Sequence, residues 1–105
     1  MTEETPLSEQ WYKVAQECVE AEGAASLLED TKSSALSQQI AALGDMPFNR
    51  AEATVKASPE WMDHLGEINK ARTKANELKV HMEYLRMKFQ EYQSAEANNR
   101  TQARL

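Results

Sequence analysis

The residues of this 105-residue chain that could do metal chemistry are two histidines and one cysteine. His64 and His81 lie far apart on a stretch expected to be one helix, and Cys18 has no second thiol to pair with. No set of histidine, cysteine or carboxylate residues repeats the spacing of a known group of metal ligands. We therefore expect no metal, no cofactor and no small-molecule site.

A catalytic nucleophile is equally hard to find. A reactive cysteine needs a basic neighbour, whereas Cys18 lies near Glu17 and Glu20 in an apolar stripe, where the side chain behaves as a small hydrophobe. The clustered serines have no histidine near them, and three isolated glycines cannot form a phosphate-binding loop. We expect a protein that binds rather than an enzyme.

Charge is distributed unevenly along the chain. Residues 1–45 carry two cations against nine acids, whereas residues 70–88 carry six cations against two acids. Arg72, Lys79 and Arg86 recur every seven residues and share one side of a helix, so direct nucleic-acid binding is an alternative. The net charge of −5 opposes tight non-specific DNA binding, and pairing with the acidic segment explains the same basic residues.

The acidic first segment also supports a different hypothesis. A face carrying Glu17, Glu20, Glu29 and Asp30 could imitate DNA and occupy a host nuclease or an anti-phage defence complex. A solvated acidic helix is the simpler interpretation, so we keep this inhibitor function as the alternative.

The elements that would position these residues are helices. Thr5 and Pro6 resemble an N-cap and a first helical residue, and Gly44 lies where a C-terminal cap belongs, so a helix is expected over about 6–43 with a weak point at Gly23. Its apolar stripe comprises Leu7, Trp11, Val14, Cys18, Ala21, Ala25 and Leu28.

Two further helices follow the first. Asn49 and Glu52 resemble a capping box that opens a short helix over about 50–57, and Ser58-Pro59 starts a long helix over about 59–98. The apolar residues of the long helix recur at the 3.5-residue period of a coiled-coil seam. They are Trp61, Leu65, Ile68, Ala71, Ala75, Leu78, Met82, Leu85, Phe89 and Tyr92.

Two long helices joined by a short connection favour an all-α antiparallel hairpin. A turn near residue 51 places position 29 opposite about 73, position 22 opposite 80 and position 17 opposite 85, so acids would face the basic stretch from Arg72 to Arg86. One seam cannot hide all the aromatic and methionine side chains, so we expect a homodimer that forms a helical bundle.

Length and composition place this hairpin in one domain, residues 1–105, with frayed ends at 1–5 and 99–105. No apolar run is long enough to cross a membrane, and the acidic start Met1-Thr2-Glu3-Glu4 is unlike a secretory signal. A single cysteine suits a reducing compartment, so we expect a cytoplasmic protein with no membrane partner.

Three segments resemble a group of short all-helical proteins from tailed phages and mobile elements: Arg50 to Ala53, Ala57 to Trp61, and Leu85 to Phe89 with its continuation towards Arg100. Genes of that group often lie near those for annealing recombinases and single-stranded-DNA-binding proteins. The resemblance implies an accessory protein of the bacterial host cytoplasm that binds a partner in DNA recombination or replication. The expected partner-binding residues are Trp61, Arg72, Lys79, Tyr84, Arg86 and Met87.

Overall fold

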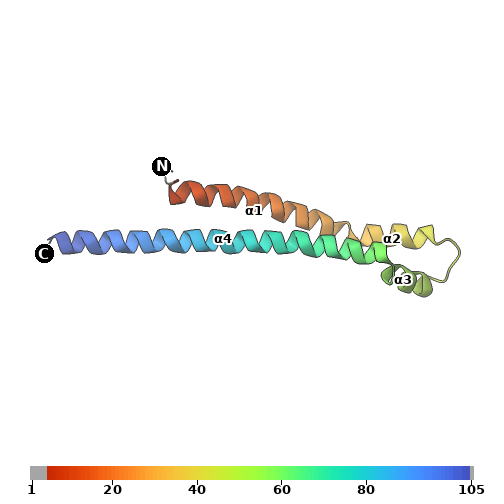
Figure 1. The fold of residues 1–105 in the computed structure, drawn as a ribbon. Helices are drawn as coiled ribbons and strands as arrows, with labels where there is room; N and C mark the ends of the chain where they lie inside the picture. The colour runs from red at the N-terminus through yellow and green to blue at the C-terminus, as the bar shows by residue number, and fades with distance from the viewer. Residues whose placement is uncertain (1–4, 105) are drawn as a thin grey trace. The chain divides into compact units, whose positions relative to one another are not determined.

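The computed structural model describes residues 5–104, which form four α-helices and no strand (Figure 1). The helices are α1 (Leu7–Asp30), α2 (Lys32–Ala42), α3 (Phe48–Lys56) and α4 (Pro59–Arg104). The all-α prediction is therefore confirmed. Residues 1–4 and 105, where frayed ends were expected, lie outside the described part of the chain.

The chain forms two compact units, each defined by the residues that contact one another within it. The middle unit is residues 21–75, and the terminal unit combines residues 5–20 with the end of the chain from residue 76. Helices α1 and α4 each contribute residues to both units, while α2 and α3 belong to the middle unit and pack against each other.

The expected helix over 6–43 is interrupted, and the interruption is not at Gly23. Gly23 lies inside α1, and the break falls at Thr31, between α1 and α2. The Thr31 hydroxyl donates to the Leu28 carbonyl oxygen at 2.9 Å. A threonine that bonds back to its own backbone competes with regular helix geometry, and this is a physical reason for a break at Thr31.

Two of the expected helix ends are confirmed. Gly44 follows α2 with a φ of 73°, the left-handed conformation that glycine adopts without a Cβ clash. At the start of α4 the Trp61 amide donates to the Ser58 hydroxyl oxygen at 3.3 Å, so Ser58 is a side-chain N-cap.

Other helix ends differ from the prediction. α1 begins at Leu7, and Thr5 accepts a bond from the Gln10 side chain through its carbonyl oxygen. α3 begins at Phe48 with no side-chain cap, so the expected capping box is wrong, and Glu52 instead pairs with Lys56 at 2.7 Å. α4 continues to Arg104 rather than ending near residue 98, because no glycine or proline interrupts it after Gly66.

The core of the middle unit is built largely from small side chains. Ala25 and Ala75 are 0% exposed. A methyl group is fully buried only when another part of the chain packs closely against it. Trp61, Val55 and Ala51 are the other buried hydrophobic residues of this unit. Most of the expected stripe on α1 and the first half of the seam on α4 are therefore buried or half-buried.

In the terminal unit the buried hydrophobic side chains are Val14, Cys18 and Leu85. The expected seam does not continue to its predicted end, since Phe89 is 42% exposed and Tyr92 is 58% exposed. These two rings instead line a hollow of about 620 Å³ together with residues 5–8 and Gln10. Among the described residues, no large side chain is fully buried in either unit.

Two glycines offer a matched test of these backbone conformations, because a Cβ on either would meet no atom within 4 Å. We expect Gly44→Ala to destabilise the protein by about 1–2 kcal/mol through left-handed strain. We expect Gly23→Ala, inside α1, to stabilise it by about 0.5–1 kcal/mol. Urea unfolding followed by circular dichroism measures both, and equal shifts for the two variants would contradict this assignment of helix ends.

Candidate protein-binding surfaces

Arg72 is the most highly bonded side chain described on α4. Its Nη1 donates to Glu22 Oε2 at 2.9 Å, its Nε donates to Glu29 Oε2 at 3.2 Å, and its Nη2 donates to Glu29 Oε1. The guanidinium therefore binds Glu29 through two parallel bonds and reaches a second carboxylate two helical turns away. We call this arrangement the Arg72 clamp.

Protonation in the clamp follows from these bonds. The hydrogen bond from Arg72 lowers the pKa of Glu29 below its ordinary value of 4.5. The bonds to Glu29, and then to Glu22, raise the pKa of Arg72 above its ordinary value. Glu29 and Arg72 are thus held in their charged forms at neutral pH.

The clamp confirms part of the expected charge pairing and changes the role of Arg72. Glu29 meets Arg72 close to the expected position 73, and Glu22, expected opposite position 80, bonds Arg72 as well. Because Arg72 is engaged by two carboxylates within the middle unit, it is not available as the partner contact that we expected from the sequence.

The other two basic residues of the predicted stripe lie on the exposed part of α4. Arg86 donates to Glu83 on its own helix at 2.6 Å, and both side chains are more than half exposed. Such an exposed pair contributes little to stability, so Arg86 can exchange Glu83 for another carboxylate. Lys79 is also exposed.

Trp61 belongs to the core and not to a surface. It is 3% exposed, and its ring lies 5.7 Å from the ring of His64, at an interplanar angle of 42°. Nε2 of His64 is buried, with no hydrogen-bond partner in the part of the chain described. A partner could reach little of Trp61 in this arrangement, because the ring is buried at the wall of a hollow that it lines with Leu36 and Leu65.

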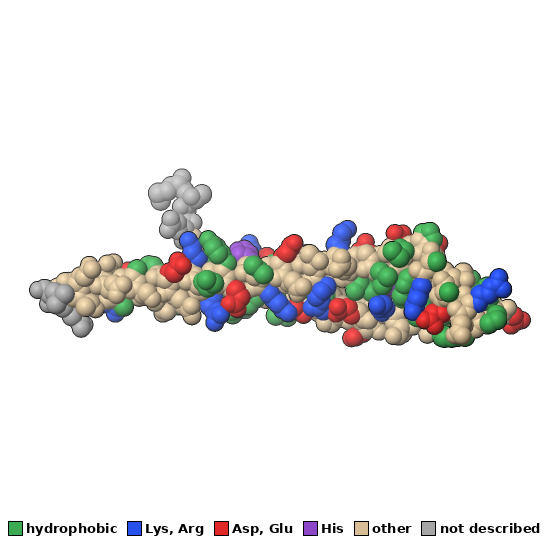
Figure 2. All heavy atoms as spheres, turned by 90° about the horizontal axis from the view of Figure 1, so that it is seen from below, with side chains coloured by type: hydrophobic (Ala, Val, Ile, Leu, Met, Phe, Trp, Pro, Cys, Tyr) green, Lys and Arg blue, Asp and Glu red, His purple; other side chains and the backbone are tan. Residues whose placement is uncertain are grey.

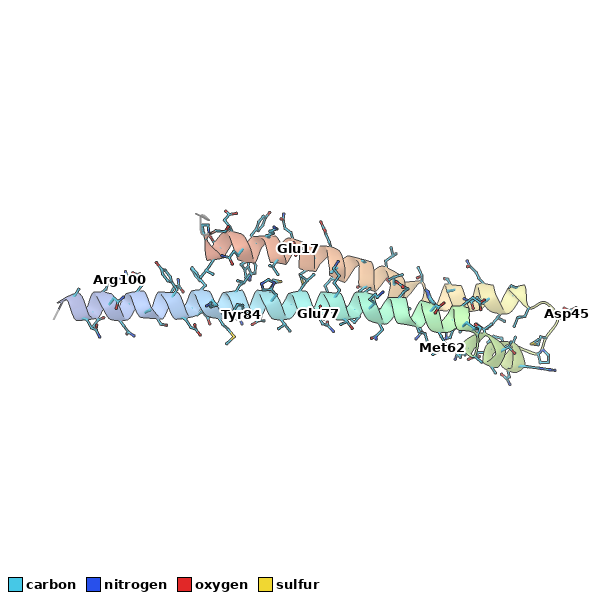
Figure 3. The ribbon with its side chains drawn as sticks, in the orientation of Figure 1. Glu17, Asp45, Met62, Glu77, Tyr84 and Arg100 are labelled. Atoms are coloured by element: carbon cyan, nitrogen blue, oxygen red, sulfur yellow. The ribbon has the colours of Figure 1, made fainter. Side chains whose placement is uncertain are left out.

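Two of the expected partner-binding residues, Tyr84 and Met87, are 55% and 56% exposed, and Val80 is 69% exposed (Tyr84 is labelled in Figure 3). The spacing of four and three residues puts these three side chains on one face of α4. We call them the α4 stripe. Lys88 extends over the Tyr84 ring, with Nζ 5.8 Å from the ring centroid.

Val80 was missed at the sequence level, although a signal was present. Val80, Tyr84 and Met87 recur at the same helical spacing as the residues of the buried seam. Spacing alone therefore does not tell an exposed apolar stripe from a buried one.

A second exposed apolar face lies on α1 in the terminal unit. Tyr12 is 58% exposed and Val19 is 72% exposed, and with Trp11, Ala15, Gln16 and Glu20 they line a shallow hollow of about 360 Å³. We call this the α1 face. Trp11, expected in the apolar stripe of the first helix, is 37% exposed and lies at the edge of the core.

The four residues of the alternative acidic face do not share one environment. Glu29 is bound in the Arg72 clamp, whereas Asp30 is exposed at the end of α1. Glu17 and Glu20 are exposed in the terminal unit, and among residues 5–104 they form no hydrogen bond or ion pair. On the face drawn in Figure 2, acidic, basic and hydrophobic side chains are interspersed.

The described chain has neither a cluster of metal ligands nor a membrane-spanning helix. No group of three or more histidine, cysteine or acidic residues within residues 5–104 is arranged to hold a metal ion. No helix in the described chain combines the length and the apolar composition that a membrane span requires. Comparison of the chain with known protein families, with curated proteins and with solved structures gives no match.

The lowered pKa of Glu29 predicts an acid-dependent loss of stability. A carboxylate whose pKa is lower when folded stabilises the protein above its unfolded pKa, and this contribution is lost as the pH falls through the folded pKa. We expect Glu29→Gln to be less stable than wild type near neutral pH and to lose less stability on acidification to about pH 3.

Urea midpoints between about pH 7 and about pH 3 provide the measurement. Asp30→Asn is the matched control, because it removes a neighbouring carboxylate and leaves the Arg72 bonds in place. Parallel pH curves for wild type and Glu29→Gln would show that the clamp does not stabilise the folded state.

Proposed function

We propose that the chain is a non-catalytic helical adaptor of a tailed phage or mobile element. It binds a protein partner in DNA recombination or replication in the bacterial cytoplasm. The observation that carries the binding function is the exposed α4 stripe, and the phage setting rests on the sequence resemblance alone.

The composition and position of the α4 stripe support this function. Single exposed hydrophobic residues are ordinary, but three on one helix face, each more than half exposed, form a continuous apolar surface. Tyrosine and methionine are enriched at protein interfaces. Lys88, whose ammonium group lies over the Tyr84 ring, is beside the stripe and can pair with acids of the partner. The partner surface expected from this chemistry is an apolar helix or groove with an acidic rim.

We further propose that α1 and α4 form one antiparallel hairpin and that the chain is a homodimer. Within the terminal unit the start of α1 lies beside Phe89 and Tyr92, and within the middle unit a later part of α1 lies beside Arg72. This order supports an antiparallel arrangement. Self-association is supported by the twelve large hydrophobic residues that are exposed in the described chain, compared with eight hydrophobic residues that are buried.

The inhibitor alternative has less support. Glu29, one of its four carboxylates, is engaged by Arg72, which leaves Glu17, Glu20 and Asp30 for a host enzyme. Charge reversal at Glu17 and Glu20 would abolish inhibition of a nuclease but would leave binding through the α4 stripe intact. The adaptor function is therefore the one that we propose.

The test uses a purified annealing recombinase and a purified single-stranded-DNA-binding protein from the same source. We expect one of them to bind the wild-type chain, and we expect Tyr84→Ser with Met87→Ser to weaken binding at least ten-fold, because the apolar contact is lost. Isothermal titration calorimetry measures the dissociation constants.

Met62→Ser is the matched control. Met62 is 59% exposed on the first part of α4, in the middle unit, and lies outside the α4 stripe (Figure 3). Its substitution should leave the affinity unchanged. Absence of binding to both candidate partners, or equal affinities for the Tyr84–Met87 variant and wild type, would refute the proposed adaptor function.

A further inference from the structure

The α1 face has features that the α4 stripe lacks. Its apolar residues Trp11, Tyr12 and Val19 surround the small side chain of Ala15 and the shallow hollow of about 360 Å³. A small residue at the centre of an apolar helix face allows a second helix to approach closely, with larger side chains packing on either side.

The charges beside this face are also specific. Lys13 is the only cation in the sequence of α1, and Glu17 and Glu20 follow it by one and two helical turns on the same flank. Within residues 5–104 none of these three side chains forms a hydrogen bond or an ion pair, although all three are exposed. A lysine four residues before a glutamate has the less favourable order for pairing within one helix.

We propose that the α1 face binds the α1 face of a second copy of this chain, antiparallel, about a two-fold axis that passes near Ala15 and Gln16. This pairing places Tyr12 of each copy against Val19 of the other. It also places Lys13 of each copy beside Glu17 and Glu20 of the other. Tyr12 and Val19, and Lys13 with Glu17 and Glu20, then each have a complement supplied by the same face of the second copy.

The self-complementary pattern is the reason for choosing a second copy as the occupant. A two-fold contact is isologous, so a surface that dimerises must complement itself under a rotation of 180°. The α1 face meets this condition in two respects. Across the axis Tyr12 faces Val19, and Lys13 faces Glu17 and Glu20. In a parallel two-fold pair the charged flanks of the two copies would lie on opposite sides of the contact, so Lys13 of one copy would not meet Glu17 and Glu20 of the other.

This inference rests on the homodimer within the proposed function and names the surface that forms it. The α4 stripe takes no part in the contact, so it stays available for the partner protein. A dimer of this kind would present two α4 stripes, and binding to a multimeric recombinase or to a repeated array would gain from the two attachment points.

The test exploits the reciprocal charges. In Lys13→Glu, residue 13 repels the acids of the second copy, and in Glu17→Lys with Glu20→Lys the introduced lysines repel Lys13. We expect each variant alone to dimerise at least ten-fold more weakly than wild type. An equimolar mixture of the two variants restores both attractive contacts, and we expect it to regain the wild-type dimer constant within a factor of about three.

Sedimentation velocity over a concentration series measures the association, and circular dichroism verifies that helicity is unchanged. Tyr12→Ser with Val19→Ser tests the apolar contact separately and should also weaken the dimer at least ten-fold. Lys32→Glu, at an exposed lysine on α2, is the charge control and should leave the dimer intact.

The possible outcomes separate the inference from the proposal on which it rests. A monomeric wild-type chain would overturn both the homodimer and this interface. A dimer that withstands all the α1 substitutions would keep the homodimer and refute the α1 face as its surface. If the charge variants dimerise weakly and their equimolar mixture does not regain the wild-type dimer constant, the antiparallel pairing is refuted. Loss of the dimer in the Tyr84–Met87 variant alone would assign self-association to the α4 stripe.

Discussion

The structure of the middle unit depends on the Arg72 clamp. Glu22 and Glu29 are separated by two helical turns on α1, and one guanidinium on α4 bonds both. A sliding movement of either helix by one turn would break these bonds and leave the carboxylates without their cation. Single exposed ion pairs contribute little to stability, but a half-buried guanidinium with bidentate geometry selects one alignment over its neighbours.

Small residues make this alignment possible. Ala25 lies between the two clamp glutamates in sequence, and Ala75 follows Arg72 by about one turn; both are fully buried. Two helices lined by alanine approach closely, so the long Arg72 side chain can reach across to carboxylates on the other helix. Close packing and charge pairing therefore act together, and replacing the alanines with larger side chains would separate the groups of the clamp.

A thin core has a functional consequence. The described chain buries few side chains, most of them small, so large hydrophobic residues remain outside the core on both α1 and α4. Their placement is not random, because the α1 face and the α4 stripe each follow helical spacing. One face is flanked by charges of both signs that can complement a second copy, and the other lies beside Lys88. The proposed adaptor function and the proposed dimer rest on these two faces.

The sequence by itself determined the all-α class, the end of α2 and the start of α4. Gly44 and Ser58 were recognisable because a left-handed glycine and a serine N-cap depend on local backbone geometry alone. The apolar stripe of α1 was also recognisable, because helical spacing can be read from residues close together in the sequence. The break at Thr31 was not recognisable, because threonine is tolerated inside a helix, as Thr54 in α3 and Thr101 in α4 are.

The tertiary structure alone decided which residues are accessible. Trp61 and Tyr84 are both large aromatic residues of the same helix, yet Trp61 is 3% exposed and Tyr84 is 55% exposed. Arg72 and Arg86 have the same chemistry and differ in whether an acid of another helix reaches them. Burial and long-range ion pairing depend on residues far apart in the chain. No local pattern specifies which of two similar side chains will be buried or paired.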